Sequence, residues 1–136
     1  DSVSPDEHVI YNKILADLFN ILSKNNKIYV FTNSPLKVSQ KILKLLGINQ
    51  YISEVFSAET FGVSKPDIKA FERVLSIIGA RAQDCIMIGD SIEKDLKNAK
   101  FLGLKTIAIS EKTNHDYVDY WIKDLNEIND LLEFKN

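Results

Sequence analysis

Hydrophobic positions follow two alternating patterns along this chain of 136 residues. Short apolar runs rich in β-branched residues predict buried parallel strands, and they lie at 28–32, around 55–56, at 85–88 and at 105–109. Longer segments with apolar residues three or four positions apart predict amphipathic helices, and they lie at 5–24, 35–46, 67–78 and 92–102. This alternation of strand and helix predicts an α/β fold, in which helices cover both faces of a parallel sheet.

The apolar positions of these segments predict the core. One face of the first helix, which Ser4 and Glu7 would open as a capping box, carries Ile10, Ile14, Leu18, Ile21 and Leu22. Four aromatic residues fall on apolar faces and are expected inside, namely Phe19, Phe56, Phe71 and Phe101. A chain of this length buries roughly two-thirds of its unfolded surface, which is enough for one core. We therefore expect residues 1–136 to form a single domain.

Two carboxylates follow the predicted strand at 85–88. Asp90 comes directly after Gly89, and Asp95 lies five residues further on, at the start of a helix. Carboxylates beyond the carboxyl end of a parallel strand lie where open α/β sheets bind ligands, and Mg²⁺ prefers such oxygen ligands together with phosphate and water. The alternative is structural, with Asp90 as a helix cap and Asp95 as a surface residue.

Small polar residues end the strand at 28–32. Thr32 and Asn33 precede Ser34 and Pro35, which suit the cap and the first residue of a helix. The free N–H groups and the dipole of a helix start favour an anion, and the Thr32 hydroxyl and the Asn33 amide add donors. The segment therefore predicts a phosphate site.

Lys65 is a candidate counter-charge for that phosphate. Pro66 follows it, which favours an extended conformation for Lys65 and places Pro66 at the start of the next helix. A lone lysine is usually a solvated surface charge. At the same sheet edge as a phosphate donor and a carboxylate pair, it gains a chemical role.

The chain resembles the haloacid dehalogenase-like (HAD) hydrolases over about residues 5–134, because its candidate residues occur in the same order as the family motifs: Thr32, Lys65, Asp90 and Asp95. The resemblance implies a three-layer, Rossmann-like core. It implies that Thr32, with Asn33 beside it, binds phosphate, and that Lys65 is catalytic and steadies both phosphate and nucleophile. It also implies that Asp90 ligates Mg²⁺ directly and that Asp95 supports the metal shell or Lys65.

The tail of the chain fits the same resemblance. Residues 119–127 resemble the last short strand of the family and the start of its closing helix, and Asp124 and Glu127 have the spacing of a capping box. Strings typical of dinucleotide and P-loop sites, Gly-x-Gly-x-x-Gly and Gly-x-x-x-x-Gly-Lys-Ser/Thr, do not occur in this sequence.

One family motif is missing from the sequence. Family members carry Asp-x-Asp after their first strand, where the first Asp is the nucleophile and the second is the general acid and base. Here Val3 stands two positions after Asp1, where the second Asp would be, and no Asp-x-Asp occurs in the sequence. We expect either a carboxyl-terminal portion that lacks the first strand and a complete cap domain, or a degenerate member. A missing N-terminal segment or a second chain would then complete the sheet.

The resemblance implies a Mg²⁺-dependent phosphomonoester hydrolase that acts on a small phosphorylated metabolite or nucleotide. Phosphoglycolate phosphatase-like and pyrimidine 5′-nucleotidase-like members resemble the chain about equally. Without the nucleophile, this chain alone should be inactive. The alternative is a non-catalytic HAD-like module that binds metal or phosphate or serves in an interaction.

Composition narrows the expected partners. The net charge of -2 gives no basic surface for a nucleic acid polymer. No apolar run approaches the roughly 20 residues that span a bilayer, and no secretory signal opens the chain. Cys85 falls in a predicted buried strand, where it would serve as a small hydrophobe. We expect a cytoplasmic protein without membrane partners.

Overall fold

Two parallel sheets organise the described residues, 13–110 and 116–135, of this computed structural model. The chain divides into two compact units, Asp1–Gly62 and Val63–Asn136, and each unit holds one sheet. Parallel strands that alternate with helices confirm the predicted α/β class. None of the described helices is long and apolar enough to cross a membrane.

The first unit contains two paired strands. Strand β1 (Tyr29–Thr32) runs parallel to β2 (Glu54–Ser57), in a register that sets Thr32 opposite Ser57. The helices of this unit are α2 (Lys13–Ser23), α3 (Leu36–Leu46), the short 3₁₀ turn η1 (Asn49–Tyr51) and α4 (Ala58–Phe61). Helix α3 ends as predicted at Gly47, whose φ of 79° is the left-handed conformation that glycine tolerates.

The core of the first unit differs in part from the prediction. Its buried cluster comprises Ala16, Leu43 and Ile48, and Leu15 and Phe19 pack against it. Leu18 is buried as predicted. The rest of the predicted face was wrong in part, because Ile14 and Ile21 are 66% and 47% exposed. Residues 1–12, which include the predicted capping box and Ile10, lie outside the described residues.

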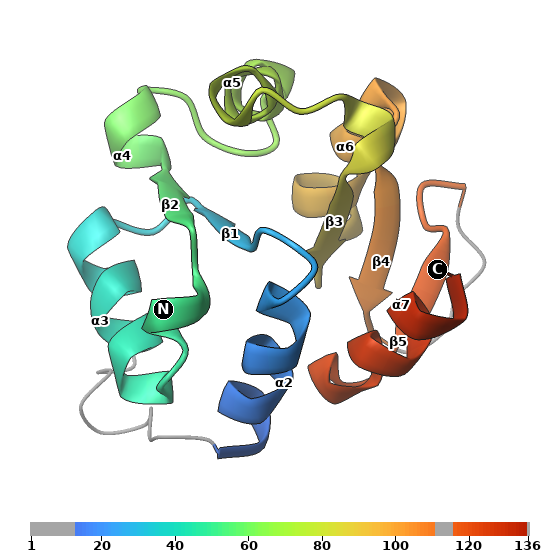
Figure 1. Cartoon of the computed structure of the whole chain (residues 1–136). Coiled ribbons are helices and arrows are strands. Elements are labelled where there is room, and N and C mark those ends of the chain that lie inside the picture. The colour runs from blue at the N-terminus through green and yellow to red at the C-terminus, as the bar shows by residue number, and fades with distance from the viewer. Residues whose placement is uncertain (1–12, 111–115, 136) are drawn as a thin grey trace. The chain divides into compact units, whose positions relative to one another are not determined.

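The second unit contains three parallel strands. They lie in the order β3 (Ile86–Gly89), β4 (Lys105–Ile109), β5 (Tyr120–Ile122), side by side in Figure 1. Its helices are α5 (Ile68–Ile78), α6 (Lys97–Leu102), α7 (Ile128–Lys135), the 3₁₀ turns η2 (Ala82–Asp84) and η4 (Leu125–Glu127), and the π-helical turn η3 (Ile92–Leu96). The predicted capping box of Asp124 and Glu127 is confirmed.

The middle strand of the second sheet is β4. Its residues Thr106, Ile107 and Ala108 are buried, and Ala108 forms a cluster with Leu96 and Val118. Asp119 links the residues that precede β5 to the start of β4. Its carboxylate accepts hydrogen bonds from Thr106 and from the Lys100 ammonium.

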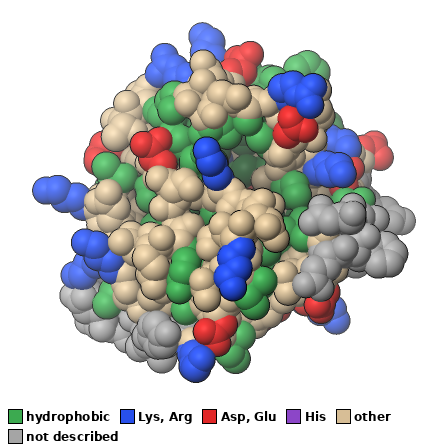
Figure 2. Space-filling model, viewed as in Figure 1, with side chains coloured by type: hydrophobic (Ala, Val, Ile, Leu, Met, Phe, Trp, Pro, Cys, Tyr) green, Lys and Arg blue, Asp and Glu red, His purple; other side chains and the backbone are tan. Residues whose placement is uncertain are grey.

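Three predictions about burial in the second unit were wrong. Strand β3, predicted to be buried, lies at one edge of the described three-stranded sheet, and its Ile86 is 41% exposed. Cys85 precedes β3 and is only partly buried. Phe101 is 78% exposed, because Leu96 and Ala99 define the inner face of α6 and Phe101 lies two residues beyond Ala99, on the opposite side. On the face drawn in Figure 2, hydrophobic side chains lie between positively and negatively charged ones.

Candidate functional site

In the first unit, the predicted phosphate residues form a turn at the end of β1. The Thr32 hydroxyl accepts a hydrogen bond of 3.0 Å from the Ser34 N–H, and Asn33 is exposed between them. Pro35 takes the cap position of α3, so the helix begins at Leu36, one residue later than predicted, and Ser34 is not its cap. Boundaries of this kind shift easily by one residue. The start of an eleven-residue helix still follows the turn.

Ser57 supports this turn, and the sequence reasoning missed it. Its buried hydroxyl donates to the Ser34 carbonyl at 3.3 Å and accepts from the Glu59 N–H at 3.1 Å. Because β1 and β2 are parallel and in register, Ser57 reaches the sheet edge at the same level as Thr32. Ser57 could have been predicted from the sequence as a supporting residue, because it lies at the end of the predicted strand that follows the Thr32 strand.

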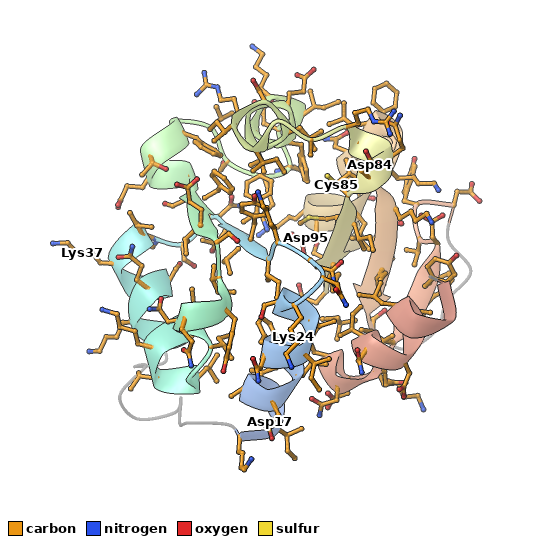
Figure 3. The ribbon with its side chains drawn as sticks, in the orientation of Figure 1. Asp17, Lys24, Lys37, Asp84, Cys85 and Asp95 are labelled. Atoms are coloured by element: carbon orange, nitrogen blue, oxygen red, sulfur yellow. The ribbon has the colours of Figure 1, made fainter. Side chains whose placement is uncertain are left out.

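In the second unit, the structure brings Lys65 and Asp95 together. The Lys65 ammonium lies 2.7 Å from Oδ1 of Asp95, and the two side chains are only 11% and 10% exposed. The other oxygen of Asp95 accepts a hydrogen bond of 3.2 Å from the Ser91 N–H. Asp95, labelled in Figure 3, is therefore a buried carboxylate with both oxygens engaged.

Gly89 leaves the room for that carboxylate. A Cβ atom at position 89 would lie 2.4 Å from Oδ2 of Asp95, which is closer than real contacts allow. The sequence reasoning used Gly89 only as the end of a strand. The close approach of Asp95 to Gly89 depends on the path of the chain after β3, which cannot be predicted from the sequence pattern.

Asp90 is exposed and comes directly after the last residue of β3. The helical turn that follows is capped by Ser91, whose hydroxyl accepts from the Lys94 N–H at 3.1 Å. The structural alternative is therefore wrong on both points, since Asp90 does not cap the helix and Asp95 is not a surface residue. The Asp90 carboxylate remains exposed at the carboxyl end of the strand.

The donor set can be tested against Mg²⁺. Among residues 13–110 and 116–135, no three His, Cys, Asp or Glu side chains form a group that could hold a metal. Mg²⁺ commonly uses one or two protein carboxylates and completes its shell with phosphate and water. Asp90 fits a direct ligand of this kind. Asp95 fits a supporting role, because both of its oxygens already accept hydrogen bonds.

The segment that carries Lys65 differs in one detail from the prediction. Helix α5 begins at Ile68, and its cap is Asp67, whose carboxylate accepts from the Lys69 N–H at 2.9 Å. Pro66 therefore precedes the cap and is not the first helical residue; the Lys65–Pro66 peptide bond is cis. The amide of Asn98 donates to the Pro66 carbonyl, a contact that nothing in the sequence pattern indicated.

Cys85 has the character of a structural residue. It lies beside Asp84 before the start of β3 (Figure 3), and its thiol donates weakly to the Arg81 carbonyl at 3.4 Å. Burial, and the nearby Asp84 carboxylate, raise the pKa of the Cys85 thiol. Because the thiolate is the reactive form of cysteine, this environment disfavours nucleophilic chemistry.

The chain as a whole is similar to known proteins. The sequence model of a family described as haloacid dehalogenase-like hydrolase matches residues 2–103. The chain belongs to the haloacid dehalogenase-like hydrolase family.

Two archaeal relatives carry the name glyceraldehyde 3-phosphate phosphatase. The one from Methanocaldococcus jannaschii is 30% identical over 129 residues, with 90% of this chain and 56% of the relative covered. The one from Pyrococcus furiosus is 30% identical over 110 residues, with 76% and 45% covered.

Solved HAD structures share the fold. A HAD-hydrolase, YfnB from Bacillus subtilis, in a structure bound to magnesium, has a TM-score of 0.78 and 28% identity, with 85% of this chain and 53% of that chain covered. A HAD phosphatase from Thermococcus onnurineus has a TM-score of 0.78 at 24% identity, with 89% and 57% covered. These likenesses confirm the expected Rossmann-like fold. The chain spans about half the length of the curated relatives named above.

Proposed function

We propose that this HAD chain carries the phosphate-binding, lysine and metal-binding residues of a Mg²⁺-dependent phosphomonoester hydrolase that acts on a small phosphorylated metabolite. The observation that carries the proposal is the Lys65–Asp95 pair, held in the same unit as the exposed Asp90 at the end of β3. The phosphatase names of the archaeal relatives support a small sugar or aldehyde phosphate as substrate. A nucleotide is the alternative substrate, because the sequence also resembles pyrimidine 5′-nucleotidase-like members of the family.

Each proposed role follows from the chemistry of the side chain. The Lys65 ammonium would bind phosphate as a positive charge, with its position set by Asp95. Thr32, Asn33 and the N–H groups at the start of α3 would donate hydrogen bonds to phosphate oxygens. Asp90 would hold Mg²⁺ directly and Asp95 would support it. When bound, Mg²⁺ would stabilise the negative charge that develops on the phosphoryl oxygens.

We further propose that the attacking carboxylate is not among these 136 residues. The sequence contains no Asp-x-Asp motif, and neither Asp90 nor Asp95 suits the role if one holds Mg²⁺ and the other pairs with Lys65. Strand β3 hydrogen-bonds with β4 on one side, within the described strands, so its other edge offers N–H and C=O groups for a further strand. An additional segment of the same protein, or a second chain, would supply that strand.

The absence of Asp-x-Asp also favours a second candidate function. A HAD chain that binds metal and phosphate without catalysis would need Asp90, Lys65 and Thr32 but no nucleophile. The two candidates share every residue discussed above and differ only in the completed protein. The expected cytoplasmic location and the absence of nucleic acid and membrane partners stay predictions from composition.

Binding and hydrolysis together test the proposal. Inorganic phosphate, with Mg²⁺ present, should bind the 136-residue chain in a calorimetric titration, and Lys65→Met should weaken binding. Lys94→Met is the matched control, because Lys94 is an exposed lysine of the same unit. The chain alone should not hydrolyse p-nitrophenyl phosphate or glyceraldehyde 3-phosphate, whereas a protein extended by a strand bearing Asp-x-Asp should. Equal effects of both lysine substitutions would contradict the phosphate role of Lys65.

A further inference from the structure

Two side chains one helical turn apart hold the Lys65–Pro66 segment in the second unit. Asp95, at the end of the π-helical turn η3, pairs with the Lys65 ammonium at 2.7 Å. Asn98, in the first turn of α6, donates its side-chain amide to the Pro66 carbonyl. Two consecutive residues of one loop are therefore attached to two residues three positions apart, one on η3 and the other on α6.

The Pro66 carbonyl accepts its hydrogen bond from outside α5, the helix that follows it. Helix α5 is capped by Asp67, whose carbonyl is the first to accept an intrahelical bond, from the Ala70 N–H at 3.0 Å. The carbonyl of Pro66 lies one residue earlier and is therefore outside that ladder. A backbone acceptor in this position is paired by a side chain or by water, and here the Asn98 amide donates to it.

Asn98 fixes the point from which Lys65 reaches Asp95. A lysine ammonium ends a flexible four-carbon stem, so its position depends on the anchoring of the backbone as well as on its ion-pair partner. Asp95 holds the far end of the side chain, and Asn98 holds the backbone next to its near end. We infer that Asn98 is a positioning residue for Lys65, which keeps the ammonium on Asp95 at the end of β3. Its effect on phosphate rests on the proposed function.

The test observes the Lys65 ammonium directly, by ¹H–¹⁵N correlation spectroscopy of the 136-residue chain, with the signal assigned by its loss in Lys65→Arg. Three variants separate the contributions. Asn98→Ala removes the amide, Asn98→Asp keeps the shape but cannot donate, and Asn98→Gln keeps the donor. Asn126→Ala is the matched control, an exposed asparagine of the same unit on η4.

We expect hydrogen exchange of the Lys65 ammonium to accelerate roughly threefold to tenfold in Asn98→Ala, the range that corresponds to the loss of one hydrogen bond. Asn98→Asp should accelerate it at least as much, because a second carboxylate would compete for Lys65. Asn98→Gln should retain slow exchange, and Asn126→Ala should match the unsubstituted chain. Thermal unfolding of each variant shows whether it is folded.

The inference is overturned if Asn98→Ala and Asn98→Asp lower the unfolding temperature but leave Lys65 exchange unchanged, since Asn98 would then be a purely structural contact. Titration with inorganic phosphate separates this result from the proposed function. If the positioning role and the proposed function both hold, Asn98→Ala accelerates Lys65 exchange and also weakens phosphate binding. If the unsubstituted chain binds no phosphate although Lys65 exchange responds to Asn98, the proposed function fails and the positioning role stands.

Discussion

The carboxylate of Asp95 fills the space in which a side chain at Gly89 would lie. An ideal Cβ at position 89 would be 2.4 Å from Oδ2 and 2.5 Å from Cβ of Asp95. The φ angle of Gly89 is not positive, so the need for glycine is spatial and not conformational. The end of β3 and the start of η3 therefore close around Asp95, which in turn holds Lys65.

Gly89→Ala should displace Asp95 and break its contact with Lys65. The added methyl group meets the Asp95 side chain from its Cβ outward, so rotation of the carboxylate alone cannot relieve the overlap. We expect the free energy of unfolding to fall by about 1–3 kcal/mol, as for other overpacked sites. Urea unfolding measures this loss, and the Lys65 ammonium signal should disappear in the same variant.

Gly79→Ala is the control for the glycine substitution. Gly79 has a φ of 69°, but a methyl group added there would meet no neighbouring atom within 4 Å, so alanine is strained without a collision. It should lower stability by about 1–2 kcal/mol and leave the Lys65 ammonium signal intact. If Gly89→Ala also left that signal intact, the proposed dependence of the ion pair on Gly89 would be wrong.

Removing one partner of the buried Lys65–Asp95 ion pair should lower the free energy of unfolding more than expected from replacing both partners together. Lys65→Met or Asp95→Asn alone leaves the partner buried without its counter-charge, and losses of about 3–5 kcal/mol are typical of such changes. The double variant Lys65→Met/Asp95→Asn should lose clearly less than the sum of the single variants. Urea unfolding of the four proteins completes the cycle.

An exposed ion pair supplies the comparison for that cycle. Lys13 and Asp17 are 2.9 Å apart on α2 and largely exposed, so Lys13→Met should cost at most about 1 kcal/mol. Additive losses at Lys65 and Asp95 would show that the two residues do not act as a pair. The comparison also controls for the general effect of removing a lysine.

Much of the fold could be predicted because its signals are local. The end of α3 at Gly47, the strand Lys105–Ile109 and the capping box of Asp124 each depend on residues within one or two turns. The candidate residues after β1 and those after β3 could also be identified, because polar residues just beyond the carboxyl end of a parallel strand lie where α/β sheets bind ligands. The buried state of Asp95 was not part of that prediction.

The features that failed depend on contacts far apart in the sequence. Phe101 has the same hydrophobicity as Phe71, but only Phe71 is buried, because burial depends on which face of the helix the rest of the unit covers. Asn98 and Pro66 are 32 positions apart, and their contact arises only when α6 and the loop before α5 meet. Polar positions carry no periodic pattern that would indicate such a partner.

Asp90 and Asp95 should differ in their effects on metal binding. Asp90→Asn should nearly abolish binding of Mg²⁺, because the exposed Asp90 carboxylate is the proposed direct ligand. Asp95→Asn should weaken binding by about 10–100-fold, as residues that orient a metal site do. Paramagnetic broadening by Mn²⁺ of the backbone signals of residues 89–91 measures both. Asp84→Asn, in an exposed carboxylate on η2, is the control, and equal small effects at positions 90 and 95 would argue against a metal site.

Asp119 should make the stability of the second unit depend on acid pH. Burial alone would raise the pKa of Asp119, but the hydrogen bonds from Lys100 and Thr106 outweigh it and lower this pKa below its ordinary value. The folded state therefore binds a proton less readily than the unfolded state, whose carboxyl titrates near about 3.9. The stabilisation is present above that value and is lost as the pH falls through the lower folded pKa.

Asp119→Asn should flatten this dependence. Urea unfolding of the unsubstituted chain between about pH 5 and pH 2 should show a falling free energy of unfolding, and the decline should be shallower in Asp119→Asn. Lys100→Met should give an intermediate slope, because it removes the ammonium but leaves the Thr106 N–H, which donates to Asp119 at 2.9 Å. If all three proteins lost stability in parallel, other carboxylates would dominate acid unfolding, and the hydrogen bonds of Asp119 would serve only to align β4 with β5.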